Sequence, residues 1–317
     1  MKQVIILDDY QNAALSMAPW ERLNGRASVR ALNRYIGDRA ELIRELSTAH
    51  AVVCNRERTV FDADLINALP NLELIVTSGH RNNSIDVKAA AARGIPVCGT
   101  ATLGYPTAEL TIAMLLAFFR HLPVEFNNLR AGRWQTTVGR GVRGRTLGVI
   151  GYGRIGKDVA KVCKALGMNV LAWSRSLTPE KAAADGVTCA SMDETLAGSD
   201  VVTVHLLANA QTRGIIGARE IGLMRKGALL INTARAALVD QQAMISGLHS
   251  GHLGGAALDV YDIEPLPMDH PILSAPNTLL TPHLGYVMEE NYVLSFNECC
   301  DNVDAWLNGT PKNVITP

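Results

Sequence analysis

The sequence predicts an α/β protein with two units in tandem, each a doubly wound parallel sheet with helices on both faces. Short apolar runs alternate with helical patterns over the first hundred residues, and the same alternation resumes at Thr146. A long apolar segment and a stretch rich in glycine and arginine separate the two halves. The length of 317 residues suits roughly two domains of about 150 residues each.

The first unit is expected to contain four strands, each a short apolar run: Val4–Leu7, Ala51–Cys54, Leu72–Thr77 and Ile95–Cys98. Helical spacing predicts three helices between them: Asp38–Leu46, Asp62–Leu69 and Ser84–Arg93. Asp62 and Ser84 are the expected N-caps, because their side-chain oxygens can accept a hydrogen bond from the first helical turn. Gly94 is the expected C-cap.

A long helix is predicted from about Thr107 to Leu122. Apolar residues occupy most of its faces, so we expect it to be buried all round, at a domain junction or a subunit interface. The segment Asn127–Arg145 has no clear periodicity and is expected to be a linker and surface loop.

The second unit is expected to contain six strands: Thr146–Ile150, Asn169–Trp173, Val201–Val204, Ala228–Asn232, Gly255–Val260 and Thr278–Thr281. Four helices are expected between them: Gly153–Leu166, Met192–Ala197, Ile221–Met224 and Gln241–Ser250. A final helix follows at about Glu289–Leu307, and periodicity does not decide which unit it joins.

Composition argues against several classes of partner. The 30 basic and 30 acidic residues give zero net charge, which argues against nucleic acid and anionic membranes. No run approaches the ~20 apolar residues of a membrane span, and the apolar N-terminal stretch is too short for a signal peptide. The six cysteines form no C-x-x-C pair and no zinc-type spacing with histidine. We therefore expect no metal site, and reduced thiols in a cytoplasmic protein.

A glycine-rich motif, Gly151-Tyr152-Gly153-Arg154-Ile155-Gly156, directly follows one predicted strand and opens a predicted helix. Gly151 permits a tight turn, Gly153 lets the backbone approach a pyrophosphate, and Gly156 lets the helix pack closely on the strand. The helix N-terminus offers N–H groups to the phosphates. In this context the motif predicts a dinucleotide-binding site.

The end of the next strand bears on the choice of nucleotide. An acidic residue is usual there, because it binds the adenosine ribose 2′-hydroxyl of NAD. This sequence has Ser174 followed by Arg175, so no carboxylate repels a 2′-phosphate and a guanidinium can pair with it. The alternative is that Arg175 stacks on adenine or points to solvent. NADP is favoured over NAD.

Three polar side chains follow three predicted strands, where ligands of doubly wound sheets bind. They are Arg235, Glu264 and His283. His205 also ends a strand and is expected to line the cofactor cleft. Asp259 lies inside an apolar strand end and needs hydrogen-bond partners there.

The types of these three residues suit one reaction. An arginine can hold a carboxylate with two hydrogen bonds and orient the neighbouring carbonyl. A histidine can protonate the carbonyl oxygen as hydride arrives. A carboxylate beside the imidazole favours the protonated form of the ring near neutral pH. Together they predict reduction of a 2-oxo acid to a 2-hydroxy acid.

The sequence resembles the D-isomer-specific 2-hydroxyacid dehydrogenase family over nearly the whole chain. The resemblance is carried, in order, by Leu147 to Gly156, Asn232-Thr233-Ala234-Arg235, Ala257-Leu258-Asp259-Val260 with Glu264-Pro265, and Thr281-Pro282-His283-Leu284-Gly285. It implies a Rossmann nucleotide domain, residues 101–284, and a flavodoxin-like substrate domain, residues 1–100 and 285–317. It also implies a homodimer formed through the nucleotide domain.

The resemblance implies a role for each matching residue. His283 is the expected proton donor, Glu264 its partner and Arg235 the substrate anchor. Further cofactor contacts are expected from Arg154 and Ile155 at the pyrophosphate, from Thr233, Ala234 and Asp259 at the nicotinamide end, and from Thr212. In the first domain, Ser78, Gly79 and His80 match the loop that holds the substrate carboxylate. His80 and Arg81 either favour a second anionic group on the substrate or face solvent.

The expected function is NAD(P)-dependent reduction of a small 2-oxo acid, of the glyoxylate or hydroxypyruvate type, to the D-2-hydroxy acid. One alternative is a phosphoglycerate dehydrogenase. Another is a nucleotide-sensing binding protein on the same scaffold, like the C-terminal-binding corepressors, which binds the dinucleotide without useful turnover. Formate dehydrogenases pair the histidine with glutamine, so Glu264 argues against that activity.

Overall fold

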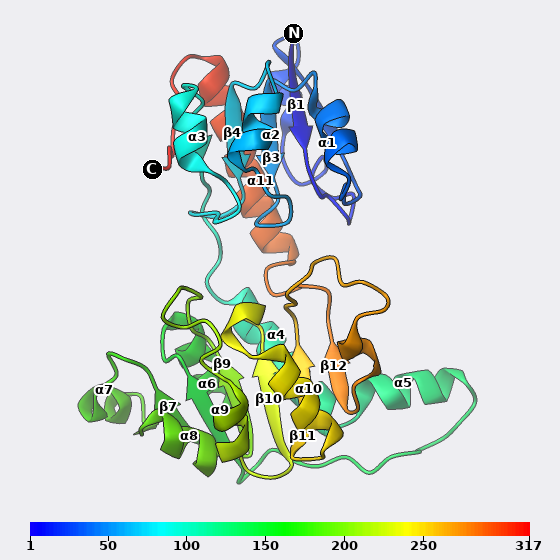
Figure 1. The fold of residues 1–317 in the computed structure, drawn as a ribbon, viewed down its shortest axis with the longest axis vertical. Coiled ribbons are helices and arrows are strands. Elements are labelled where there is room, and N and C mark those ends of the chain that lie inside the picture. Colours follow the sequence, from blue (N-terminus) through cyan, green and yellow to red (C-terminus); the bar gives the residue numbers. More distant parts are fainter. The chain divides into compact units, whose positions relative to one another are not determined.

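The computed structural model describes residues 1–317 and divides them into two compact units (Figure 1). Unit 1 consists of Met1–Leu103 and Met288–Pro317, and unit 2 consists of Gly104–Val287. Unit 2 is therefore inserted between the two segments of unit 1. The division falls three residues after each boundary expected from the sequence.

The sheet of unit 1 has five parallel strands in the order β2-β1-β3-β4-β5. They are β1 (Lys2–Ile6), β2 (Ala27–Ala31), β3 (Ala51–Cys54), β4 (Leu74–Thr77) and β5 (Val97–Cys98). This is the flavodoxin-like order of a doubly wound sheet, as predicted. The prediction missed β2, an edge strand in which only Ala27 is buried, because its sequence carries little apolar signal.

Helices cover this sheet. They are α1 (Arg39–Leu46), α2 (Ala63–Ala68), α3 (Val87–Ala92) and α11 (Glu289–Leu307), with the short 3-10 helix η1 (Trp20–Leu23). Asp62 caps α2 as predicted, but Ser84 does not cap α3. Asp86 does so, accepting a hydrogen bond from the Ala89 N–H, while the Ser84 hydroxyl donates to the Glu57 carbonyl. The final helix belongs to unit 1 and contacts β4.

The sheet of unit 2 has seven parallel strands in the order β12-β11-β10-β9-β6-β7-β8. They are β6 (Thr146–Ile150), β7 (Asn169–Trp173), β8 (Thr188–Cys189), β9 (Val201–Val204), β10 (Ala228–Asn232), β11 (Leu253–Leu258) and β12 (Thr278–Leu280). The order reverses between β6 and β9, which is the Rossmann arrangement with β12 added at one end. Ligands of such sheets bind at the carboxyl ends of the strands beside that reversal.

The helices of unit 2 lie along both faces of this sheet (Figure 1). They are α4 (Pro106–Phe119), α5 (Leu122–Arg130), α6 (Arg154–Ala165), α7 (Pro179–Ala184), α8 (Met192–Gly198), α9 (Ala218–Leu223) and α10 (Gln241–His249), with η2 (Ala236–Leu238) and η3 (Pro271–Ser274). The sequence did not predict β8 or α7, which are an edge strand of two residues and a helix of six.

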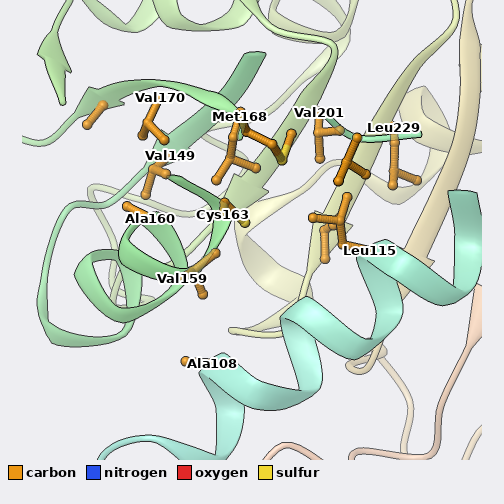
Figure 2. Packing of buried hydrophobic residues seen from close by; sticks show 14 of the residues in the cluster. Ala108, Leu115, Val149, Val159, Ala160, Cys163, Met168, Val170, Val201 and Leu229 are labelled. Atoms are coloured by element: carbon orange, nitrogen blue, oxygen red, sulfur yellow. The ribbon is translucent and has the colours of Figure 1, made fainter. Parts of the chain in front are cut away.

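One face of the unit 2 sheet packs against α4 and α6. Figure 2 shows Leu115 of α4 and Val159 of α6 directed toward strand residues such as Val149 and Leu229. The absence of a side chain at Gly255 of β11 brings the Phe118 ring of α4 against the strand backbone. This packing fixes α4 on the sheet.

The segment after α4 differs from the prediction in two ways. The long helix ends at Phe119, and His121 with a φ of 51° turns the chain into a second helix, α5, where a linker was expected to begin. In addition, α4 is not buried all round in this chain, because Ala113 is exposed and Ile112 is only half-buried. No single helix is long and apolar enough to cross a bilayer; only α4 and α5 taken together pass such a test, and they are bent by 63°.

Candidate active site

The glycine-rich loop has the geometry that each of its glycines predicts. Gly151, at the end of β6, has a φ of 103°, and a Cβ atom there would lie 2.6 Å from the main-chain carbon of His205. A Cβ atom on Gly156 would collide with the carbonyl oxygen of Gly151, so this glycine lets α6 pack closely on the loop. Around Gly153 there is open space, which a phosphate can approach. The residues present therefore fit a bound dinucleotide.

Tyr152, which follows the first glycine, connects this loop to a residue outside it. The Tyr152 hydroxyl donates to Asp185 at 3.2 Å, and Lys157 of α6 forms an ion pair with the same carboxylate at 3.0 Å. Burial, with the nearby Asp185 charge, raises the pKa of Tyr152 to about 12, so the phenol stays protonated and donates this bond. The loop is thereby tied to the end of α7.

Ser174 and Arg175 directly follow β7, as expected from the sequence. Ser174 is half-buried, and Arg175 is exposed. The Nη1 atom of Arg175 donates to the Oε1 atom of Gln211 at 2.9 Å. Gln211 was not singled out from the sequence, because a hydrogen bond between two distant surface loops leaves no local pattern.

His205 and Thr212 lie in the segment that follows β9, and the main chain of His205 lies against Gly151 of the glycine-rich loop. The Nε2 atom of His205 is 2.9 Å from the hydroxyl of Thr203, while its buried Nδ1 atom has no partner in the structure. Burial lowers the pKa of His205 to about 4, which keeps the ring neutral. Thr212 is buried and donates to the Leu207 carbonyl at 2.6 Å, so its hydroxyl shapes its own loop.

The loop after β10 is shaped by Asn232 at the strand end. Its side chain accepts from the N–H of Ala234 at 3.0 Å and donates to the carbonyl of Arg235 at 2.9 Å. The hydroxyl of Thr233 pairs with that of Thr111 on α4 at 2.8 Å. The Nη1 atom of Arg235 donates to the Ala234 carbonyl at 2.7 Å. Arg235 therefore lies on a turn that hydrogen bonds between residues 232 and 235 stabilise.

Asp259, at the end of β11, holds the loop that carries His283. Its carboxylate accepts hydrogen bonds from the Thr281 hydroxyl at 2.6 Å, the Leu284 N–H at 2.7 Å and the Gly285 N–H at 2.8 Å. These donors flank His283 on both sides. Burial raises the pKa of Asp259, and the hydrogen bond from Thr281 opposes that shift. The family resemblance implies a cofactor contact for Asp259, and in the structure three protein donors engage its carboxylate.

His283 and Glu264 form a close pair. The Nδ1 atom of His283 lies 2.6 Å from the Oε2 atom of Glu264, and both side chains are half-buried. The other carboxylate oxygen of Glu264 accepts from the N–H of Tyr261 at 2.8 Å. The Tyr261 hydroxyl in turn bonds to the carbonyls of Leu258 and Thr281, which links the ends of β11 and β12. Sequence reasoning missed Tyr261, although it lies between Asp259 and Glu264.

The three predicted residues follow three neighbouring strands. Arg235 comes after β10, Glu264 after β11 and His283 after β12, and these strands pair in parallel, so their carboxyl ends share one edge. The glycine-rich loop leaves the same edge, at the end of β6. Because Nδ1 of His283 faces Glu264, Nε2 is the ring nitrogen left for a substrate. The ring of Tyr286 packs against this imidazole in a T-shaped arrangement, with centroids 5.5 Å apart.

The residues predicted in the first domain belong to unit 1. Ser78 is buried, and its hydroxyl accepts from the Arg56 N–H at 3.0 Å. The N–H of Gly79 donates to the Thr100 hydroxyl at 2.8 Å, so this amide already has a partner. His80 is exposed, and with Arg81 it lines a hollow of about 1070 Å³ in unit 1.

Comparison with known proteins identifies the family. The sequence model of the NAD binding domain of D-isomer specific 2-hydroxyacid dehydrogenases matches residues 112–285. A glycerate dehydrogenase of Methylorubrum extorquens is 34% identical over 287 residues, which cover 87% of this chain and 88% of that protein. The chain belongs to the D-isomer specific 2-hydroxyacid dehydrogenase family.

Other relatives are similar over different shares of their length. A D-3-phosphoglycerate dehydrogenase of Archaeoglobus fulgidus is 41% identical over 252 residues, 78% of this chain but 47% of that protein. The chain thus spans about half the length of some of the curated relatives it matches. Among solved structures, a phosphoglycerate oxidoreductase from Vibrio cholerae has a TM-score of 0.93 at 36% identity, covering 98% of this chain and 100% of that one. This likeness supports the two-unit fold.

Proposed function

We propose that the chain is an NAD(P)-dependent oxidoreductase that reduces a small 2-oxo acid, of the glyoxylate or hydroxypyruvate type, to the D-2-hydroxy acid. The observation that carries the proposal is the His283–Glu264 pair on the sheet edge that also bears Arg235 and the glycine-rich loop. The named relatives include a glycerate dehydrogenase, a glyoxylate reductase and a hydroxypyruvate reductase.

Each side chain has a defined part in this reaction. Arg235 holds the substrate carboxylate with two hydrogen bonds and so orients the adjacent carbonyl. His283 donates a proton from Nε2 to the carbonyl oxygen while the carbonyl carbon receives hydride. Glu264 accepts a hydrogen bond from the Nδ1–H group of His283, which fixes the ring orientation and stabilises its charged form. The bound dinucleotide supplies the hydride.

The proposed cofactor contacts come from residues of unit 2. Backbone groups from Gly151 to Gly156 meet the pyrophosphate at the N-terminus of α6. Ser174 and Arg175 meet the adenosine ribose, and we propose NADP over NAD because the strand end carries a guanidinium and no carboxylate. Further contacts toward the nicotinamide are proposed from His205, Thr212, Thr233 and Ala234, whereas Asp259 is proposed to act through the His283 loop that it holds.

Unit 1 is the proposed substrate domain. Its loop Ser78–His80 is the proposed carboxylate-binding loop, and the exposed Arg81 adds a positive charge beside it.

A homodimer is proposed through α4 and α5. None of the residues of α5 is buried, and four of its apolar side chains, Leu122, Val124, Phe126 and Leu129, are between 47% and 61% exposed. Trp134, which follows, is 76% exposed. Apolar surface of this extent suits a subunit interface.

Six free cysteines, of which only Cys189 is not buried, suit the reducing cytoplasm.

A second candidate is a D-3-phosphoglycerate dehydrogenase, which the 41% identity to the Archaeoglobus protein favours. In that case we propose Arg81 as the partner of the substrate phosphate.

The test is oxidation of NADH and NADPH measured against a panel of 2-oxo acids, with oxidation of D-3-phosphoglycerate measured in the reverse direction. We expect turnover with a small 2-oxo acid, and loss of about 10²–10⁴-fold in kcat in His283→Ala with cofactor affinity retained. Nucleotide binding without turnover of any substrate would indicate a sensor and contradict the proposal. Arg235→Lys should also damage turnover, because a point charge cannot replace a planar fork.

A further inference from the structure

The hydrogen bond between Arg175 and Gln211 joins loops from two strands that flank β6. Arg175 follows β7, and Gln211 lies in the segment after β9. In the sheet, β6 lies between β7 and β9, and the glycine-rich loop begins at its end. The pair therefore connects the two loops on either side of the proposed phosphate site.

The chemistry of this contact leaves the guanidinium available. The Oε1 atom of Gln211 accepts one hydrogen bond from Nη1 of Arg175 at 2.9 Å. An amide carries no charge, so the positive charge of Arg175 is not cancelled. A guanidinium has five N–H groups, and four of them remain free for other acceptors.

The turn that presents Gln211 is itself held in place. The side-chain oxygen of Asn209 accepts from the N–H of Gln211 at 2.8 Å and from the N–H of Thr212 at 3.2 Å. The Thr212 hydroxyl accepts from the N–H of Asn209 at 2.9 Å and donates to the carbonyl of Leu207 at 2.6 Å. The glutamine is therefore carried on a closed, hydrogen-bonded turn.

We propose that Gln211 is a positioning residue that sets cofactor specificity: it holds the Arg175 guanidinium where an adenosine 2′-phosphate binds. This inference rests on the proposed function, because it requires that the chain bind NAD(P). A flexible arginine loses conformational freedom when it grips a phosphate, and a partner that holds it beforehand reduces that loss. The advantage applies to NADPH alone, because NADH has no 2′-phosphate.

The test is a set of dissociation constants for NADH and NADPH, measured by fluorescence titration. Gln211→Ala should weaken NADPH binding about threefold to tenfold and leave NADH within about twofold. Gln211→Glu should weaken NADPH further, because a carboxylate cancels the charge of Arg175 and repels the phosphate. Arg175→Ala should remove the preference for NADPH. Gln242→Ala, at an exposed position of α10, is the matched control and should change neither constant.

The double variant separates positioning from a direct effect. In the Arg175→Ala background, Gln211→Ala should have no further effect on NADPH binding, because the glutamine acts through the arginine. Equal weakening of both cofactors by Gln211→Ala, unchanged or tighter NADPH binding, or an undiminished effect without Arg175 would each overturn the inference. Failure of the wild type to bind either nucleotide would instead overturn the proposed function.

Discussion

The Nδ1 atom of His283 lies 2.6 Å from the Oε2 atom of Glu264, on loops that leave neighbouring strands. The second oxygen of that carboxylate is held by the N–H of Tyr261, so Glu264 has one orientation and fixes the imidazole in turn. In the proposed mechanism, Glu264 therefore orients the ring and leaves Nε2 for the substrate.

Glu264→Gln keeps the size of this side chain and removes its charge. We expect kcat to fall about tenfold to hundredfold, because the amide no longer stabilises the protonated imidazole. The dissociation constant for NADPH should stay within about twofold. Glu290→Gln, on the exposed start of α11, is the control for loss of a carboxylate. An unchanged kcat in Glu264→Gln would remove the pairing from the mechanism.

Asp259→Asn tests whether Asp259 holds the His283 loop or contacts the cofactor. An asparagine has one oxygen, so its NH₂ group would face an N–H that now donates to the carboxylate. We expect kcat to fall at least tenfold while the NADPH dissociation constant changes little. A loss confined to cofactor affinity would support the contact predicted from the sequence. Asp269→Asn, at an exposed position, is the control.

Two glycines of unit 2 should respond to alanine in opposite ways. At Gly255 a Cβ atom would collide with the Phe118 ring and lie 2.7 Å from the Asn277 carbonyl oxygen, so Gly255→Ala should lower the free energy of unfolding by about 1–3 kcal/mol. At Gly222, inside α9, nothing lies within 4 Å of the added atom, so Gly222→Ala should raise it by about 0.5–1 kcal/mol. Urea unfolding measures both. Similar effects of the two changes would refute the close packing of α4 on β11.

His205 should make the fold sensitive to acid. Burial lowers its pKa from 6.5 to about 4, so below pH 6.5 the unfolded chain binds a proton that the folded chain excludes. The stability that depends on the neutral ring is therefore present above pH 6.5 and is lost as the pH falls toward 4, by at most about 3 kcal/mol. In His205→Gln, the loss of stability between pH 7 and pH 5 should be smaller by up to about 2 kcal/mol. Urea unfolding at the two pH values measures this, with His249→Gln as the surface control; equal losses in wild type and His205→Gln would contradict the prediction.

The elements that the sequence predicted are those with a strong local signal. Central strands such as β3 and β9 are continuous runs of buried residues, and the glycine-rich motif lies between a strand and a helix as expected. The edge strands β2 and β8 were missed, because an edge position buries few side chains and leaves little pattern. The break after Phe119 was also missed, although Pro123 in the first turn of α5 is a local signal for the start of a new helix.

In the candidate site too, the residues with a local sequence signal were predicted and those without one were missed. Arg235, Glu264 and His283 were identified because each follows a strand and parallel strands end at one edge. Gln211 and Tyr261 act through hydrogen bonds to groups that only the folded chain brings near them. Asp259 was singled out correctly as a buried acid that needs partners, but its three donors could not be predicted, because they depend on the path of the chain after β12.

The insertion of unit 2 within unit 1 determines the order in which the chain can fold during synthesis. All strands of unit 2 precede residue 288, so they emerge from the ribosome before the second segment of unit 1 and can pair before it arrives. The first 103 residues have to wait for α11, which contacts β4, and for the segment whose Ile315 N–H bonds to the Val97 carbonyl. The first segment of unit 1 is therefore made before unit 2 but acquires its complete set of contacts only after unit 2 has been made.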